Sequence, residues 1–401
     1  MRDARPPASH QDVSAELRHA PPLPLEQPVP VTATSRATEI DDICAELCLQ
    51  VSDGGPELVL LFAAPRYPLA ALGAALGACL PADCTVMGCS TAGELCNQGY
   101  RNDSVVAIAF PRGSFRSAAL KLRGLSRLRV SDWISQLRAA HDAFRPDPAK
   151  HVIALMLVDG LCTREEMLSV AIDAALPGVP VFGGSTGFGG DPDQGDVLLD
   201  GEASMDAAAI CLIESDMVIQ PIVIDHFSAL DDDMVVTAAR PEPRILDEIN
   251  AEPAAQEYAR LVGTDISGLS PAVFAQHPLL VKINGRNFVR AIRGQTDEGG
   301  LILMSAIETG TVMQLGRAED LAGGFARALE ALPVRPVLTL SFDCILRRIA
   351  VERAGLSDCL RDCFDRYNVA GFNTYGEQHC GMHVNQTFIG LAFLPEHADH
   401  A

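Results

Sequence analysis

One plan recurs three times along this sequence and restricts its fold more than any other feature. Each copy has an apolar run typical of a strand, a helical stretch, a second short strand, and a turn rich in glycine and hydroxyl or amide residues. Each turn begins about 30 residues after the start of the first strand, which is the length of a parallel strand–helix–strand crossover. The sequence therefore predicts an α/β fold of repeated strand–helix–strand units. The three turns read GCSTAGE (88–94), GGSTGFG (183–189) and GFNTYGE (371–377).

The pattern changes between the second and third copies. LLVKINGRNFVRAI (279–292) places Asn284-Gly285 between two strand-like runs, which is a strong β-hairpin signal. LILMSAIETGTVMQLG (301–316) predicts another hairpin around Thr309-Gly310. We therefore expect antiparallel hairpins inside the second half of a mixed α/β chain.

Charge and hydropathy exclude two classes of partner. The formal net charge is −21 and the pI is near 4.8, so a nucleic acid or an anionic membrane would be repelled. No apolar run approaches the roughly 20 residues that span a bilayer. Residues 1–35 are rich in proline and polar residues, and we expect a disordered tail there, without the apolar segment of a secretory signal. The expected location is cytoplasmic.

The second turn resembles a catalytic motif. Residues 183–187 match G-x-S-x-G, the nucleophile elbow of α/β-hydrolases. That elbow requires a helix directly after the serine, whereas the loop-forming sequence FGGDPDQGD follows Ser185 and its turn. The third turn carries Asn373 at the equivalent position. We therefore expect a structural turn and no enzyme.

The segment GEQHCGMHVNQT (376–387) concentrates possible metal ligands near the end of the sequence. His379 and His383 are four residues apart, but Gly381 lies between them, so a helical ligand pair is not expected. His383 stands at a strand entrance, on the same face as Asn385. A histidine there is more often a hydrogen-bonded structural group than a ligand, but a neutral imidazole also serves as an axial ligand of haem iron. Both interpretations stay open.

These motifs, taken together and in order, resemble the FIST-domain family of bacterial signalling proteins. The resemblance covers roughly residues 40 to 395 and implies a FIST N-terminal domain (36–218) and a FIST C-terminal domain (219–397) after the tail. The combination of FNTYGEQ and GMHVNQT is similar to the nitric-oxide-sensing FIST haemoproteins. The motifs are GCSTAGEL (88–95), GGSTGFGGD (183–191), FVRAI (288–292), GFNTYGEQ (371–378) and GMHVNQTFIGLAF (381–393).

The resemblance implies a cytoplasmic sensor that binds haem b and nitric oxide and regulates a histidine kinase or a cyclic-di-GMP enzyme. It implies His383 as the proximal iron ligand, with His226 as the competing histidine. Arg290 is either the partner of a haem propionate or another carboxylate, or an ordinary charged residue of the hairpin. The alternative is a haem-free FIST sensor of a small polar ligand such as an amino acid.

Overall fold

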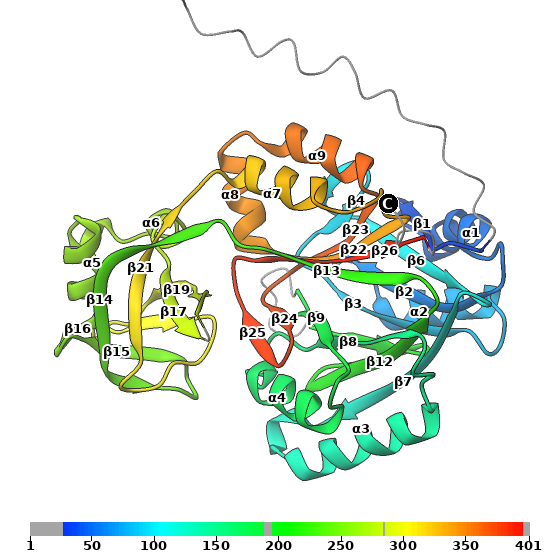
Figure 1. The fold of residues 1–401 in the computed structure, drawn as a ribbon, viewed down its shortest axis with the longest axis horizontal. Coiled ribbons are helices and arrows are strands. Elements are labelled where there is room, and N and C mark those ends of the chain that lie inside the picture. The colour runs from blue at the N-terminus through cyan, green and yellow to red at the C-terminus, as the bar shows by residue number, and fades with distance from the viewer. Residues whose placement is uncertain (1–26, 188–194, 284, 396–401) are drawn as a thin grey trace, which may run out of the picture.

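The three apolar runs form central strands of three different sheets (Figure 1). The structure is a computed structural model that describes residues 27–187, 195–283 and 285–395. It has the predicted mixed α/β class. The strands are β1 (Val31–Ser35), β2 (Pro56–Ala63), β3 (Thr85–Ser90) and β6 (Val105–Pro111) in the first sheet; β7 (Phe115–Arg123), β8 (His151–Val158), β9 (Val181–Ser185) and β12 (Ala207–Ser215) in the second; and β13 (Val218–Ile224), β22 (Leu338–Cys344), β23 (Val369–Thr374) and β26 (Phe388–Leu394) in the third.

These twelve strands follow one order in all three sheets: β1-β6-β2-β3, β7-β12-β8-β9 and β13-β26-β22-β23. Within each sheet the last two strands are parallel and are joined through helices. The other neighbours are antiparallel. The central strands β6, β12, β22 and β26 are buried along their whole length, so both of their faces carry apolar residues.

Each sheet is completed by a short hairpin that comes from the turn of another sheet. The chain between β3 and β6 joins the third sheet, and the chain between β23 and β26 joins the second. These two hairpins cross the predicted boundary between residues 218 and 219. The hairpins are β4 (Glu94–Cys96) with β5 (Gly99–Arg101) on β23, β10 (Val197–Leu199) with β11 (Glu202–Ser204) on β3, and β24 (Glu377–His379) with β25 (Met382–Val384) on β9.

Helices cover the outer face of each sheet, and the inner faces share a central core. Phe62, Phe182, Phe342 and Phe372 bring all three sheets into that core, and none is exposed. We call this assembly the three-sheet body. Its helices are α1 (Ile40–Val51) and α2 (Leu69–Cys79); α3 (Val130–Phe144) and α4 (Glu165–Ala175), with the 3₁₀ helix η1 (Leu125–Arg127); and α7 (Leu321–Glu330), α8 (Ile345–Arg353) and α9 (Ser357–Arg366).

Residues 227–318 form an eight-stranded sheet with an apolar core of its own, which we call the insert. Figure 1 shows it beside the body, entered through β13 and left toward α7. Its elements are β14 (Phe227–Arg240), β15 (Ile245–Ile249), β16 (Glu252–Pro253), α5 (Ala254–Val262), η2 (Ile266–Gly268), α6 (Pro271–Gln276), β17 (Leu279–Ile283), β18 (Arg286–Arg290), β19 (Ile292–Gln295), β20 (Leu301–Leu303) and β21 (Val312–Ala318).

The two predicted hairpins have different outcomes. β17 and β18 pair antiparallel as expected, although Asn284 itself lies outside the described residues. The hairpin around Thr309-Gly310 is wrong, because β20 pairs with β15 and β19 while β21 pairs with β14 and β17. The chain between them instead crosses to the body, where Ser305 donates to Asn385 Oδ1 at 3.1 Å.

The predicted disordered tail is wrong over its last residues. β1 pairs antiparallel with β6 and buries Ala33 and Ser35, so the alternation in VTATS is that of an edge strand. Residues 1–26 of that tail lie outside the described part of the chain. Among the described residues, no helix is long and apolar enough to cross a membrane.

Candidate functional site

The three glycine-rich turns meet and hydrogen-bond to one another. Thr91, Thr186 and Thr374 in these turns are completely buried. The turns therefore join the three sheets and expose few groups to a ligand. The bonds that close the ring are Ala92 N–H to Asn373 O at 3.0 Å, Ser185 N–H to Gly376 O at 2.8 Å, and Gly187 N–H to Ser90 O at 3.0 Å.

Ser185 is part of this ring and is 1% exposed. Its Oγ accepts a hydrogen bond from Gln378 Nε2 at 3.0 Å. A nucleophile elbow requires an exposed serine at the start of a helix. This burial favours the structural interpretation of the turn; the segment 188–194 after it lies outside the described residues.

The two turns that read T-x-G-E each carry a buried glutamate that fixes the next strand. Glu94 accepts hydrogen bonds from Thr91 and from Ser104, the residue before β6. Glu377 accepts from Thr374 and from the backbone N–H of Thr387, the residue before β26. Burial raises the pKa of both carboxyl groups. These motif residues therefore connect each turn to the strand that follows it.

His383 lies in β25 and is 4% exposed. Its Nδ1 is 3.1 Å from Gln378 Nε2, and the same amide nitrogen donates to the carbonyl of Gly376 at 3.2 Å. The same nitrogen also lies 3.0 Å from Ser185 Oγ, so three polar groups, Nδ1 of His383 among them, surround an amide nitrogen that carries two hydrogens. Within the described part of the chain, Nε2 of His383 has no hydrogen-bond partner. Burial lowers the pKa of His383 despite the opposing charges of Glu166 and Glu165, so the ring is neutral.

The residues around His383 do not fit an iron ligand. An iron-bound imidazole presents an unprotonated nitrogen to the metal and donates from the other ring nitrogen. In His383 the nitrogen facing a metal would be Nε2, because Nδ1 contacts Gln378. The Cε1–Nε2 edge of the ring lies against Gly376, where an added Cβ would stand 2.7 Å from Nε2. The described residues contain no cluster of three or more His, Cys, Asp or Glu suited to a metal ion.

His226, the competing histidine, precedes β14 and is 5% exposed. Its ring centroid lies 4.0 Å from that of Phe227, and among the described residues its Nδ1 has no hydrogen-bond partner. Burial, together with the charge of Arg347, lowers the pKa of His226 to about 3. The folded protein therefore holds this ring neutral.

Replacing His226 with phenylalanine is expected to weaken the acid sensitivity of the protein. The pKa is about 3 in the folded state and about 6.5 when unfolded, so the unfolded state binds more protons between these values and stability falls as pH drops through this window. From pH 6 to 5 the wild type should lose roughly 1 kcal/mol more than the variant in urea denaturation. His151→Phe, at an exposed site, serves as the control. Parallel losses in wild type and His226→Phe would contradict the buried neutral ring.

Arg290 ends β18 and donates from Nη1 to the carbonyl of Val289 at 3.2 Å. Burial lowers its pKa, and the nearby charge of Glu166 opposes this shift. Arg290 does not line the cavity described next. Its role as a carboxylate partner stays a prediction.

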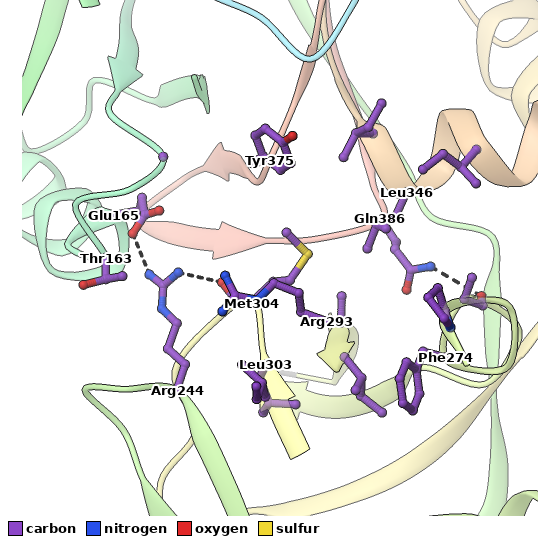
Figure 2. A pocket seen from close by; sticks show the side chains of 18 of the residues that line it. Thr163, Glu165, Arg244, Phe274, Arg293, Leu303, Met304, Leu346, Tyr375 and Gln386 are labelled. Atoms are coloured by element: carbon purple, nitrogen blue, oxygen red, sulfur yellow. Dashed lines mark hydrogen bonds and ion pairs between the residues drawn. The ribbon is translucent and has the colours of Figure 1, made fainter. Parts of the chain in front are cut away.

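A cavity of about 370 Å³ lies where the insert meets the three-sheet body (Figure 2). The body contributes residues around the start of α4, residues of α8, and Tyr375 and Gln386. The insert contributes α6 and the strands β19 and β20 with their flanks. Small-molecule sites measure about 300–1,000 Å³ and often lie between two such units. The apolar lining includes Phe274, Ile302, Leu303, Leu346 and Ile349.

Arg244 closes one side of the cavity and is 8% exposed. Its Nη2 donates to Glu165 at 2.5 Å and to Glu166 at 2.8 Å, and its Nη1 donates to the carbonyl of Met304 at 2.7 Å. Figure 2 shows two of these contacts, to Glu165 and Met304. Arg244 belongs to the insert and the two glutamates to the body. We call these three residues the clamp.

Two members of the clamp, Arg244 and Glu166, are charged at neutral pH. Burial alone would raise the pKa of Glu166, but the charge of Arg244 and the hydrogen bond from the Ala306 backbone hold it below its ordinary value. Burial disfavours the Arg244 cation, yet Glu165 and Glu166 raise its pKa. Glu166 also accepts the backbone N–H of Ala306 from the insert at 2.9 Å. The clamp therefore binds the insert to the body through ionised groups.

The sequence pattern Thr163…Glu166 also predicts a capping box at the start of α4, and this prediction is wrong. The N-cap of α4 is Arg164, without a side-chain cap, and Thr163 has a φ of 51°. The Glu166 carboxylate instead accepts hydrogen bonds from the Arg244 side chain and the Ala306 backbone N–H. A tertiary ion pair has replaced the local hydrogen bond.

Three polar side chains give the cavity its chemistry. Gln386 is 1% exposed, and its Oε1 has no hydrogen-bond partner among the described residues. Burial raises the pKa of Tyr375, so its phenol stays protonated at neutral pH. Arg293 is exposed and presents a guanidinium suited to a carboxylate. Sequence reasoning did not find Arg244, Glu165 or Gln386, because the cavity depends on how two distant segments meet.

Comparison with known proteins identifies the family of this chain. No curated protein matches the chain. A family model for the FIST N domain matches residues 57–252, and a model for the FIST C domain matches residues 254–380. The two models cover most of the chain and describe sensory, signal-transduction domains, which confirms the resemblance drawn from the turn motifs. The chain belongs to the FIST-domain family.

Proposed function

We propose that this protein is a cytoplasmic sensor that binds a small polar ligand, such as an amino acid, without haem. The ligand occupies the cavity between the insert and the three-sheet body. The downstream partner in this proposal is a histidine kinase or a cyclic-di-GMP enzyme, as the family resemblance implies. The observation that carries the proposal is a 370 Å³ cavity whose walls come from both units and whose lining holds a buried acceptor without a partner in the described structure.

The lining supports a ligand with an apolar body and polar ends. Phe274, Leu346 and Ile349 offer apolar surface. Arg293 provides a cation for a carboxylate, and Gln386 provides an acceptor for a donor group. Arg244 is not free for this task because the clamp already engages it with two carboxylates.

The position of the cavity supports a sensory mechanism. A ligand that touches both units stabilises one relative position of the insert and the body over others. Such a shift at the junction changes the surface that a partner protein contacts. Binding alone is sufficient for this signal, and the mechanism requires no chemical step.

The haem and nitric-oxide hypothesis stays a prediction from the resemblance. The arrangement around His383 counts against it, because Nε2, the ring nitrogen that does not contact Gln378, lies against Gly376. His226 is not on the cavity lining either. We therefore favour the haem-free sensor.

Replacing Met304 with tryptophan is expected to abolish ligand binding by filling the cavity, into which Met304 projects (Figure 2). Purified wild type is titrated with each common amino acid and followed by thermal unfolding. A ligand at a hundred times its Kd adds about 2.7 kcal/mol of stability. This gain should vanish in Met304→Trp.

The matched control is Met205→Trp, because Met205 is 40% exposed and lies away from the cavity. It should keep the full ligand response. A parallel titration with haemin tests the competing hypothesis. A sharp Soret band that moves with nitric oxide and disappears in His383→Ala, with no response to any amino acid, would overturn the proposal.

A further inference from the structure

Gln386 is held in a fixed position where the body meets the insert. It lies between β25 and β26 and has a φ of 51°, a backbone conformation uncommon outside glycine. Its neighbours are tied on both sides: Asn385 accepts from Ser305, and the N–H of Thr387 donates to Glu377. The side chain therefore projects from a rigid turn into the cavity.

The orientation of its amide follows from one hydrogen bond. Nε2 donates to the carbonyl oxygen of Ala275 in α6 at 3.4 Å, a long contact. A carbonyl only accepts, so the opposite orientation would bring two oxygens together. Oε1 consequently points away from α6, toward the interior of the cavity in Figure 2.

That oxygen is buried and has no hydrogen-bond partner in the described structure. A buried acceptor left unpaired is unfavourable, and a ligand that donates to it removes the penalty. A ligand that places only acceptor atoms beside Oε1 would be repelled by this oxygen. Glu165, the carboxyl side chain among the described lining residues, is already bound to Arg244, so it does not substitute for Gln386 as an acceptor.

From this geometry we infer that Gln386 selects a ligand carrying a hydrogen-bond-donating nitrogen, a primary amide or an ammonium group. Oε1 accepts from that nitrogen while Nε2 of the same side chain holds α6 of the insert. This inference rests on the proposed function, since it assumes that the cavity is the ligand site. The inference specifies the chemical class of the ligand and names Gln386 as the residue that recognises it. One side chain then contacts both the ligand and the insert.

The test uses three probes of similar shape: 4-methylpentanamide, 4-methylpentanoate and isopentylamine. Calorimetric titration of the full-length protein is expected to show the amide or the amine binding at least about tenfold more tightly than the carboxylate. In Gln386→Met, which removes both the acceptor and the donor, that preference should fall to within about threefold. In Gln386→Glu the carboxylate should bind still less, and the amine should gain over the amide because the acceptor is now charged.

The outcomes separate this inference from the proposed function. Equal binding of all three probes, lost in Met304→Trp, keeps the cavity as the ligand site and overturns the role of Gln386. A tenfold preference that survives in Gln386→Met also overturns it. If none of the probes binds the wild type, both the cavity site and its selectivity are wrong. Thermal unfolding of each variant shows whether it is folded before binding is measured.

Discussion

Replacing Arg244 with methionine is expected to lower the free energy of unfolding by about 3–5 kcal/mol. Methionine is similar in length but leaves the carboxylate of Glu165, only 2% exposed, without its cation. Removing one partner of a buried ion pair is costly because the remaining charge stays desolvated. The carbonyl of Met304 also loses its donor. Urea denaturation followed by circular dichroism, which reports on insert and body together, measures the change.

The control for this prediction lies on the same insert. Arg240 pairs with Asp247 at 2.7 Å, but the arginine side chain is 54% exposed. Exposed ion pairs contribute about 0.2–1 kcal/mol, so Arg240→Met should change stability little. Adding Glu165→Gln to Arg244→Met should recover part of the loss, because it removes the unpaired charge. A cost for Arg244→Met no greater than for Arg240→Met would show that the clamp does not hold the insert.

The sequence predicts the local parts of this fold well and their assembly poorly. The helical stretches expected in the first two copies are α2 and α4, and the Asn284-Gly285 signal correctly marks a hairpin. The pairing of β24 with β9, in contrast, could not be predicted from local sequence. β24 is a three-residue strand whose partner, β9, lies almost 200 residues earlier in the chain. Nothing in so short a strand specifies that partner, so the crossing of hairpins between sheets could not be predicted.

The candidate site was missed for the same reason. His383 and Arg290 attract attention because their residue types are chemically distinctive, yet neither lines the cavity. Gln386 stands only three residues beyond His383, and no local pattern distinguishes its amide from a surface amide. Its role follows from the approach of α6, which belongs to the insert. Glu166 likewise matches a helix-capping pattern until Arg244 is placed beside it.

The glycines that open the three repeated motifs lie inside β3, β9 and β23, and the packing of these strands explains why glycine recurs there. Gly88, Gly183 and Gly371 each stand directly beside the neighbouring parallel strand, in register with Leu61, Met156 and Ser341. A Cβ on any of them would overlap the carbonyl oxygen of that neighbour, far inside van der Waals contact. Backbone atoms cannot rotate away as a side chain does. The glycines therefore permit the close strand approach on which the ring of turns depends.

Gly183→Ala is accordingly expected to destabilise the protein by about 3 kcal/mol or more, at the upper end of overpacking costs. Trp133, the single tryptophan, is 2% exposed on α3 against the same sheet, so its fluorescence in urea reports the loss. The control is Gly77→Ala in α2, where an added Cβ meets nothing within 4 Å and should stabilise the helix by about 0.5–1 kcal/mol. If Gly183→Ala unfolds at the same urea concentration as wild type, β9 can shift away from β8 without loss of stability. Close packing would then not explain why glycine recurs in the three motifs.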